Sequence, residues 1–248
     1  MKNLLFTSLT VFMSLLYGIS SGAEEVPRGF QAHLVPQAEA VLASQYAGRI
    51  IKIPVKNGDS FKKGNILVSF DCRILRSERK KAKAELQISE ATFKSNEQLL
   101  EYQSISNLEV DIARAEVLKS KAQLGIVEAQ IGFCTIKAPY SGRVVKVAVH
   151  SHESVKIGDE LMEIVDSKAP EIQLFVPSNL ITKVQPGTTF QIKVHETGKQ
   201  YPATLVRIGG KIDPMSQTID AYGTFQGKAP ELIPGMSGTA TFSGINQN

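Results

Sequence analysis

The sequence predicts a mainly β protein in which a long α-helical coiled-coil hairpin divides a flattened β domain, with a small antiparallel β-barrel beside it. Three observations support this fold class. Two similar segments lie on either side of a proline-free stretch rich in helix-forming residues, and short apolar stretches separated by Gly and Pro follow residue 171. With 42% hydrophobic and 21% charged residues, the composition is that of a globular protein.

The repeat relates residues 48–67 to residues 142–161 without a gap, at an offset of 94 residues and with eight identities in 20 positions. In each half, apolar and polar residues alternate before a turn, which is the period of a half-buried strand. Neither half could bury its apolar face alone, so we expect residues 47–71 and 135–166 to form one flattened domain. The identical pairs are Gly48/Gly142, Arg49/Arg143, Lys52/Lys146, Val55/Val149, Ser60/Ser154, Lys62/Lys156, Gly64/Gly158 and Leu67/Leu161.

Residues 72–134 are predicted to form the hairpin. Helix-forming residues dominate this segment, and its only glycines are Gly125 and Gly132. Ser106 precedes Glu109 by three residues, the spacing of a capping box that opens a helix. We therefore expect helices over residues 73–102 and 106–132, and the short connection makes them antiparallel.

Apolar residues at coiled-coil spacing predict the seam between the two helices. A second stripe on the second helix consists of Val110, Val117, Leu124 and Ile131. Since the first helix covers only one face of the second, this stripe is predicted to contact another copy of the chain; the alternative is a solvated helix with scattered apolar residues. The predicted seam consists of Leu75, Ala82, Leu86, Phe93 and Leu100 on one helix and Leu108, Ile112, Ala115, Ala122, Ile126, Ala129 and Phe133 on the other.

The segment from residue 167 to residue 248 is predicted to form the barrel. Strands are expected near residues 172–176, 189–194, 203–208, 218–222 and 238–242, with one short helix at 178–184. Extended segments within residues 24–46 are expected to join the same barrel.

The first 23 residues have the pattern of a secretory signal peptide. Lys2 precedes an apolar run from Leu4 to Leu16, and small residues follow, so cleavage is expected before Glu24. An uncleaved membrane anchor is the alternative. The net charge of +4 comes from 28 basic and 24 acidic residues, and this small excess does not predict nucleic-acid binding.

The two cysteines, Cys72 and Cys134, are equidistant from residue 103, where the tip of the hairpin is expected. In an antiparallel hairpin such residues lie opposite each other. Because exported proteins meet an oxidising compartment, the pair is a candidate disulfide. Two buried free thiols are the alternative.

The strand–turn–strand halves resemble the half-motifs of biotinyl/lipoyl carrier domains. Split by a hairpin and followed by a small barrel, they resemble the periplasmic adaptors, or membrane fusion proteins of HlyD/RND type, of tripartite efflux and secretion systems. The motifs that carry this resemblance are Gly48-Arg-Ile, Gly58-Asp, Lys63-Gly64, Leu67 and Asp71, then residues 136–144, then Leu232-Ile-Pro-Gly-Met236.

The resemblance implies a lipoyl-like split domain, no catalysis and no cofactor. It further implies that the hairpin reaches an outer-membrane channel, while the other domains contact an inner-membrane transporter of RND or ABC type. It implies a ring of adaptors, usually six, in the periplasm of a Gram-negative bacterium. In that family an Arg, a Leu and a Ser mark the tip. Leu99 and Ser106 match the last two, Ser95 occupies the Arg position, and Ile105 lies between them in the turn.

A different function, a periplasmic metal- or substrate-delivery module, would use His150, His152 and Met162. Two histidines on one turn without a further ligand form a weak metal site, and the repeat aligns them with the turn at residues 56–59. A carrier domain bears its modified Lys at the turn between its halves. Here the hairpin replaces that turn, so no covalent cofactor is expected.

Overall fold

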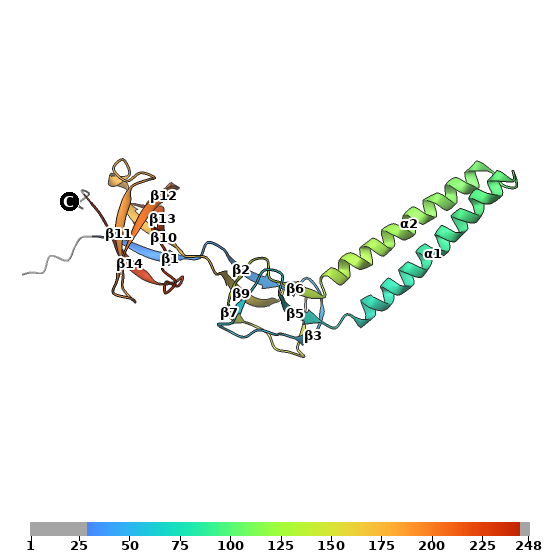
Figure 1. The fold of residues 1–248 in the computed structure, drawn as a ribbon, viewed down its shortest axis with the longest axis horizontal. Helices are drawn as coiled ribbons and strands as arrows, with labels where there is room; N and C mark the ends of the chain where they lie inside the picture. Colours follow the sequence, from blue (N-terminus) through green and yellow to red (C-terminus); the bar gives the residue numbers. More distant parts are fainter. Residues whose placement is uncertain (1–28, 244–248) are drawn as a thin grey trace, which may run out of the picture.

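The computed structural model describes residues 29–243, so the predicted signal peptide lies outside the described residues. The molecule is elongated, with a barrel at one end, a split β domain in the middle and a two-helix hairpin at the other end (Figure 1). Within residues 29–243, neither helix combines the length and the apolar character that crossing a bilayer requires.

The split domain consists of two four-stranded sheets, in the orders β2-β9-β7-β4 and β6-β5-β3-β8. Each sheet takes strands from both sides of the hairpin, as the repeat predicts. The strands are β2 (Glu39–Ala43), β3 (Gly48–Lys52), β4 (Ser60–Phe61), β5 (Ile66–Phe70), β6 (Thr135–Lys137), β7 (Gly142–Val147), β8 (Ser154–Val155) and β9 (Glu160–Asp166).

The two halves exchange equivalent backbone hydrogen bonds. The N–H of Gly58 donates to the carbonyl of Val144 at 2.8 Å, and 94 residues later the N–H of His152 donates to the carbonyl of Ile50 at 2.9 Å. Strand β4 pairs with β7 in the same way that β8 pairs with β3. Because each half completes the other, the repeat forms a single core, which includes the fully buried Leu67 and Leu161.

The barrel closes in the order β1-β10-β13-β12-β11-β14. Alternate residues of the strands, in β12 only those near Ala203 and Leu205, point into a core that includes Leu174, Phe190 and Ile192. The expected short helix is a single 3-10 turn, Ser178–Leu180. The strands are β1 (Phe30–Val35), β10 (Glu171–Pro177), β11 (Thr189–Val194), β12 (Gln200–Asp213), β13 (Thr218–Phe225) and β14 (Ser237–Phe242).

One domain assignment was wrong. Residues 24–46 were expected to join the barrel, and β1 does, but β2 pairs antiparallel with β9 in the split domain. Strand β9 has β7 on its other side, so without β2 its edge would expose unpaired backbone groups. Ala40 and Leu42 of β2 pack against the core of the split domain, which fixes this assignment.

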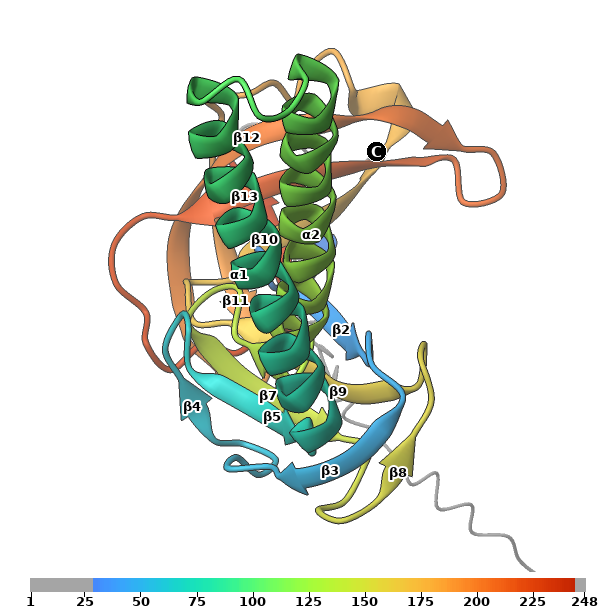
Figure 2. The ribbon, with the colours of Figure 1, turned by 90° about the vertical axis from the view of Figure 1, so that its right-hand side faces the viewer.

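The hairpin consists of α1 (Arg73–Glu101) and α2 (Asn107–Gly132), which run antiparallel side by side (Figures 1 and 2). Their lengths of 29 and 26 residues correspond to about 44 and 39 Å at 1.5 Å per residue. The predicted boundaries are confirmed within one residue, because a proline-free, helix-forming segment meets a capping box at the tip.

Candidate functional site

The hairpin carries most of the candidate functional residues, and the structure corrects which face of α2 meets α1. Val110 and Val127 are 4% and 5% exposed, and Val117, Leu124 and Ile131 are half-buried. The stripe predicted to contact another copy, Val110, Val117, Leu124 and Ile131, therefore belongs to the seam with α1.

The physical reason for this correction is that two faces of α2 share a seven-residue period. Only one of them is continuous at the seam spacing. Ala113 and Ser120 complete the sequence 110, 113, 117, 120, 124, 127 and 131, whereas Lys119 interrupts the other stripe. On α1 the predicted seam is correct, since Leu75 and Ala82 are buried and Leu86, Phe93 and Leu100 are half-buried.

The stripe that was predicted to be the seam is instead exposed. Leu108, Ile112 and Ile126 are 67%, 59% and 54% exposed, and Phe133 is 40% exposed. We call this stripe the outer face of α2; it comprises Leu108, Ile112, Ala115, Ala122, Ile126, Ala129 and Phe133. The unpartnered apolar face that the sequence predicts does exist, but different residues form it.

The side chains of the seam are smallest at the middle of the hairpin. Ser89 of α1 and Ala113 and Ser120 of α2 are too small to fill the space between the helices, and a groove of about 490 Å³ remains beside them. Glu85 and Glu116 stand at its rim, and Lys119 pairs with Glu116 at 3.0 Å. Its lining mixes acidic, basic, polar and apolar side chains, and this mixture does not indicate one class of ligand.

At the tip, Ser106 acts as the N-cap of α2. Its N–H donates to Oε2 of Glu109 at 2.8 Å, and its hydroxyl also donates to Oε2, at 3.0 Å. These two bonds, chiefly that from the backbone N–H, hold the pKa of Glu109 below its ordinary value. The carboxylate is therefore favoured in its ionised form at the positive end of the helix dipole.

The other predicted tip residues differ in exposure. Ser95 is exposed, Leu99 is 40% exposed and Ile105 is half-buried in the turn. The sequence analysis missed Tyr102, which follows the last residue of α1 and is 79% exposed. A large apolar residue at a helix end beside a predicted turn is the signal that could have identified it. Leu99, Tyr102 and Leu108 together give the tip an apolar surface.

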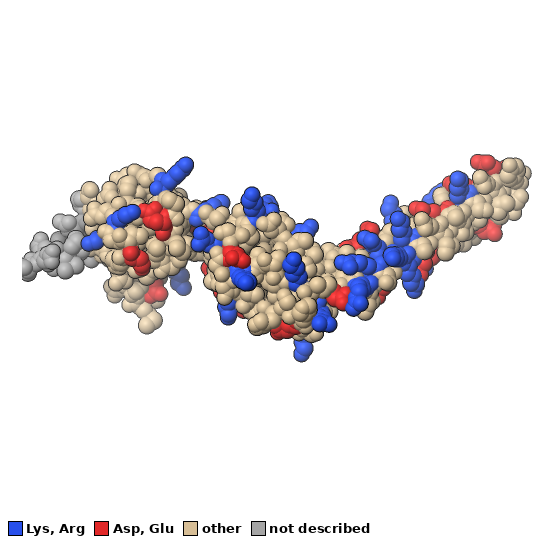
Figure 3. Space-filling view, turned by 60° about the horizontal axis from the view of Figure 1, so that its bottom comes forward, with Lys and Arg blue, Asp and Glu red and all other residues tan. Residues whose placement is uncertain are grey.

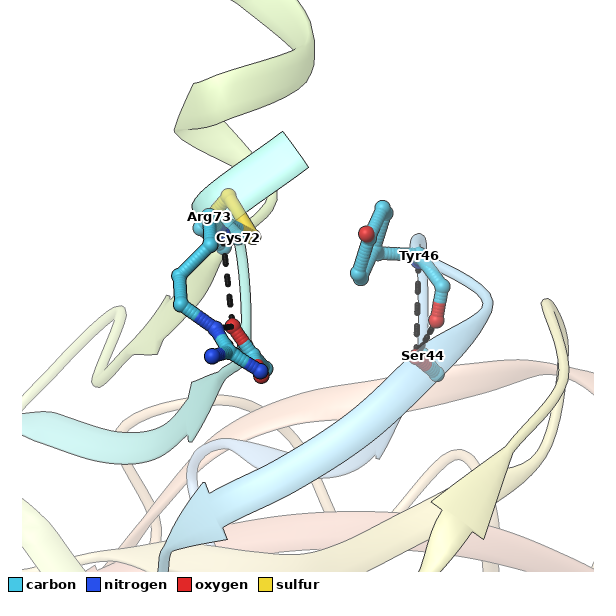
Figure 4. The surroundings of a disulfide bond; sticks show 6 residues. Ser44, Tyr46, Cys72 and Arg73 are labelled. Carbon is cyan, nitrogen blue, oxygen red and sulfur yellow. Dashed lines mark hydrogen bonds and ion pairs between the residues drawn. A yellow bond between two sulfur atoms is a disulfide. The ribbon is translucent and has the colours of Figure 1, made fainter. Parts of the chain in front are cut away.

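At the base, a disulfide joins Cys72 to Cys134, as their equal distance from the tip predicts (Figure 4). Both residues are buried, and their Cα atoms are 6.0 Å apart. Beside the disulfide, Arg73 donates from Nε and Nη2 to the carboxylate of Asp71, and these bonds lower the pKa of Asp71. The two helices are thus tied at the point where they leave β5 and enter β6.

Positive charge gathers on the half of the hairpin nearest the split domain (Figure 3). Residues 73–83 contain six basic residues and one acidic residue, all of them exposed. The first turn of α1 has no acidic residue and no side-chain cap, although the N-terminus of a helix favours negative charge. The sequence analysis missed this cluster because it considered only the total charge.

The residues proposed for metal delivery are not brought together. His150 and His152 lie on the turn before β8, where Nδ1 of His150 is 3.4 Å from a Glu153 oxygen. Met162 is fully buried in the core of the split domain. Among residues 29–243, no three His, Cys, Asp or Glu side chains form a group that could hold a metal ion.

A family model matches the split domain together with the hairpin. Residues 38–167 match the barrel-sandwich hybrid domain of RND MFP, the RND membrane fusion proteins. The match covers more than half of the chain, and it begins at the linker before β2, which agrees with the placement of that strand in the split domain.

Similar proteins include an uncharacterized protein of Haemophilus influenzae, 26% identical over 81% of this chain and 53% of its own length. The multidrug resistance protein MdtE of Escherichia coli K12 is 26% identical over 93% of this chain and 68% of its own length. The chain spans about half the length of the first curated relatives that it matches.

Among solved structures, a MacA–MexA chimera that contains the Pseudomonas aeruginosa MexA α-hairpin domain has a TM-score of 0.75. It is 20% identical, and the match covers 85% of this chain and 78% of the chimera. At this identity the likeness shows the fold, which is that of a hairpin inserted in a split domain beside a barrel.

Proposed function

Because the chain belongs to the membrane fusion proteins of RND systems, which are periplasmic adaptors, we propose that it links an inner-membrane transporter to an outer-membrane channel and catalyses no reaction. The observation that carries this proposal is the projection of a long two-helix hairpin from the end of the molecule opposite the barrel (Figure 1). A disulfide at its base and a capping box at its tip hold the hairpin in shape. Such an arm sets a distance between two partners.

The two ends of the molecule would then have different partners. The apolar tip formed by Leu99, Tyr102 and Leu108 contacts the outer-membrane channel, with Ser95, Ile105 and Ser106 beside it. The barrel and the split domain contact the transporter, of RND or ABC type. MdtE is named for multidrug resistance, and on that ground we propose export of small molecules as the activity of the assembly. The protein works in the periplasm of a Gram-negative bacterium, held near the inner membrane by its partners.

Self-association is part of this proposal. We propose that the hairpin has coiled-coil packing within one copy and that several copies form a ring, six by analogy with the family. The outer face of α2 supports this, because a soluble helix rarely leaves four large apolar residues exposed along one line without a partner.

Replacing Leu99 and Tyr102 by Ser tests the proposed function. Both residues are exposed, so the fold should be unchanged, while capture of the channel and export should both be lost. Ile157→Ser is the matched control for capture of the channel, since Ile157 is 70% exposed but lies on the split domain rather than at the tip. Deleting residues 95–110 is the stronger variant. Export that survives the deletion would show that the tip does not dock to a channel.

A further inference from the structure

Charge is divided along the hairpin between a basic half and an acidic half. The half next to the split domain, residues 73–87 and 119–133, contains eight basic and three acidic residues. The half next to the tip, residues 88–118, contains two basic and six acidic residues. A surface that carries charge only for solubility mixes the two signs. The concentration of Lys and Arg in the basic half, visible in Figure 3, therefore indicates a role that depends on positive charge.

Four of these basic residues lie together on one face of α1. Arg76, Lys80 and Lys83 follow one another at four- and three-residue spacing, which places them on the same face, and Arg79 lies beside them. All four are exposed. We call Arg76, Arg79, Lys80 and Lys83 the basic stripe; it extends for about 10 Å along the helix axis at 1.5 Å per residue.

The acidic residues at the base of α1 do not neutralise the basic stripe. Glu78 and Glu85 lie on a different face of the helix with Lys81 between them, and Lys81 pairs with Glu85 at 3.7 Å. Arg73, the first residue of α1, pairs with Asp71 at 2.8 Å. Within residues 29–243, no member of the basic stripe takes part in an ion pair. Its positive charge is therefore available to a partner.

The basic stripe weakens α1 in the isolated chain. Arg76 has a like charge three residues later, at Arg79, and another four residues later, at Lys80, and like charges at these spacings destabilise a helix. The N-terminus of a helix favours negative charge, yet the first turn of α1 has no acidic residue and Cys72 provides no side-chain cap. An anion bound along the basic stripe would relieve both effects.

The shape of the basic stripe indicates which kind of anion it fits. Guanidinium and ammonium groups bind carboxylates and phosphates, and here they stand in a row on an open surface, which suits an extended polymer with repeated anionic groups. A helix that binds a bilayer places large apolar residues next to its basic ones. Leu75 and Ala82 are instead buried in the seam, and the exposed Ile74 and Ile88 lie more than about 120° round the helix from the centre of the stripe.

The position of the basic stripe indicates where that polymer lies. The stripe is in the middle of the elongated molecule, about 30–40 Å along α1 from the tip and on the far side of the split domain from the barrel (Figure 1). In the function that we propose, the two ends contact partners in the two membranes, so the middle of the molecule faces the space between them. The polymer in that space is peptidoglycan, whose peptide stems carry free carboxylates.

We propose that the basic stripe of α1 binds the carboxylates of peptidoglycan where the wall passes beside the base of the hairpin. This proposal rests on the proposed function, which places the chain between the two membranes, and it adds a third partner to the transporter and the channel. Because the contact is electrostatic and exposed, it weakens as salt screens the charges.

Cosedimentation of the purified full chain with isolated peptidoglycan sacculi, over a range of salt concentrations, tests this binding. The triple variant Arg76→Gln/Lys80→Gln/Lys83→Gln should bind about tenfold more weakly than the wild-type chain. Its melting temperature should be equal or higher, because glutamine is a comparable helix former and the like-charge repulsion is gone. The control Lys94→Gln/Lys119→Gln/Lys121→Gln removes the same charge from other parts of the hairpin and should bind within about twofold of the wild-type chain. An equal loss of binding in both variants overturns the proposal.

Two further ligands identify the source of the anionic groups. Sacculi whose carboxylates have been amidated should no longer bind the chain, and binding that survives amidation shows that the carboxylates are not recognised. Vesicles of phosphatidylglycerol should bind more weakly than sacculi. If they bind more tightly, and the triple variant loses that binding, the partner is a membrane and the proposal is wrong.

Capture of the channel separates this inference from the proposed function, because the triple variant leaves Leu99 and Tyr102 in place. If the wild-type chain captures the channel but does not bind sacculi, this proposal fails and the proposed function stands. If the chain binds sacculi through the basic stripe but captures no channel, the bridging function fails while the binding of peptidoglycan stands.

Discussion

Two adjacent residues of α2 should differ strongly in how much their truncation destabilises the hairpin. Val127 is 5% exposed in the seam, and Ile126 is 54% exposed on the outer face. Val127→Ala removes two buried methyl groups, which are worth about 1.6 kcal/mol of transfer free energy plus a smaller cavity term. The better helix propensity of alanine offsets about 0.5 kcal/mol. The expected net loss is about 1.5–2 kcal/mol.

For Ile126→Ala we expect a change within about 0.5 kcal/mol, because the side chain is already largely solvated and alanine favours the helix. Hydrogen exchange of the hairpin amides, at a concentration where the chain is monomeric, gives the free energy of local opening for both variants. If Ile126→Ala destabilises the hairpin more than Val127→Ala, the outer face of α2 is its true seam and the assignment of faces is wrong.

Three further substitutions have defined outcomes. Arg207 donates two hydrogen bonds to Glu171, at 2.6 and 2.7 Å, and lowers the pKa of that carboxyl. Glu171→Gln should therefore cost about 1 kcal/mol of stability at neutral pH, measured by denaturant unfolding of the barrel. The difference in stability between the two proteins should vanish as the pH falls through the lowered pKa. His152 has a φ of 73°, and the equivalent residue in the first half of the repeat is Gly58. His152→Gly should therefore raise the stability of the split domain by about 0.5 kcal/mol in the same assay. A loss of stability would show that the His152 side chain stabilises this turn. Replacing Cys72 and Cys134 by Ala removes a cross-link with a sequence separation of 62 and should cost up to about 4 kcal/mol of stability in the chain-entropy model. If reductant leaves the unfolding midpoint of the wild-type chain unchanged, this prediction is wrong.

Local signals predicted much of the fold. The gapless repeat predicted the split domain because equivalent residues make equivalent bonds, as the Gly58 and His152 N–H groups do. The Ser106–Glu109 spacing located the start of α2, because a capping box satisfies helical N–H groups that otherwise have no partner. The disulfide could be predicted because Cys72 and Cys134 are equally far along the chain from the tip of the hairpin.

The errors concern choices that depend on tertiary contacts. Val110 and Ile112 belong to stripes of the same period, and only the position of α1 decides which one is buried. Strand β2 has an alternating pattern that suits either the barrel or the split domain, and the open edge of β9 decides between them. The exposure of Tyr102 depends on the path of the turn after α1.

Ser69 and Thr135 are paired neighbours in adjacent strands, so the whole hairpin is an insertion between two residues that already touch. Adding or removing matched turns of both helices would leave every contact of the β domains in place. The same two β domains can therefore carry a longer or a shorter hairpin. In the function that we propose, the length of the hairpin alone would then set the distance between the two partners.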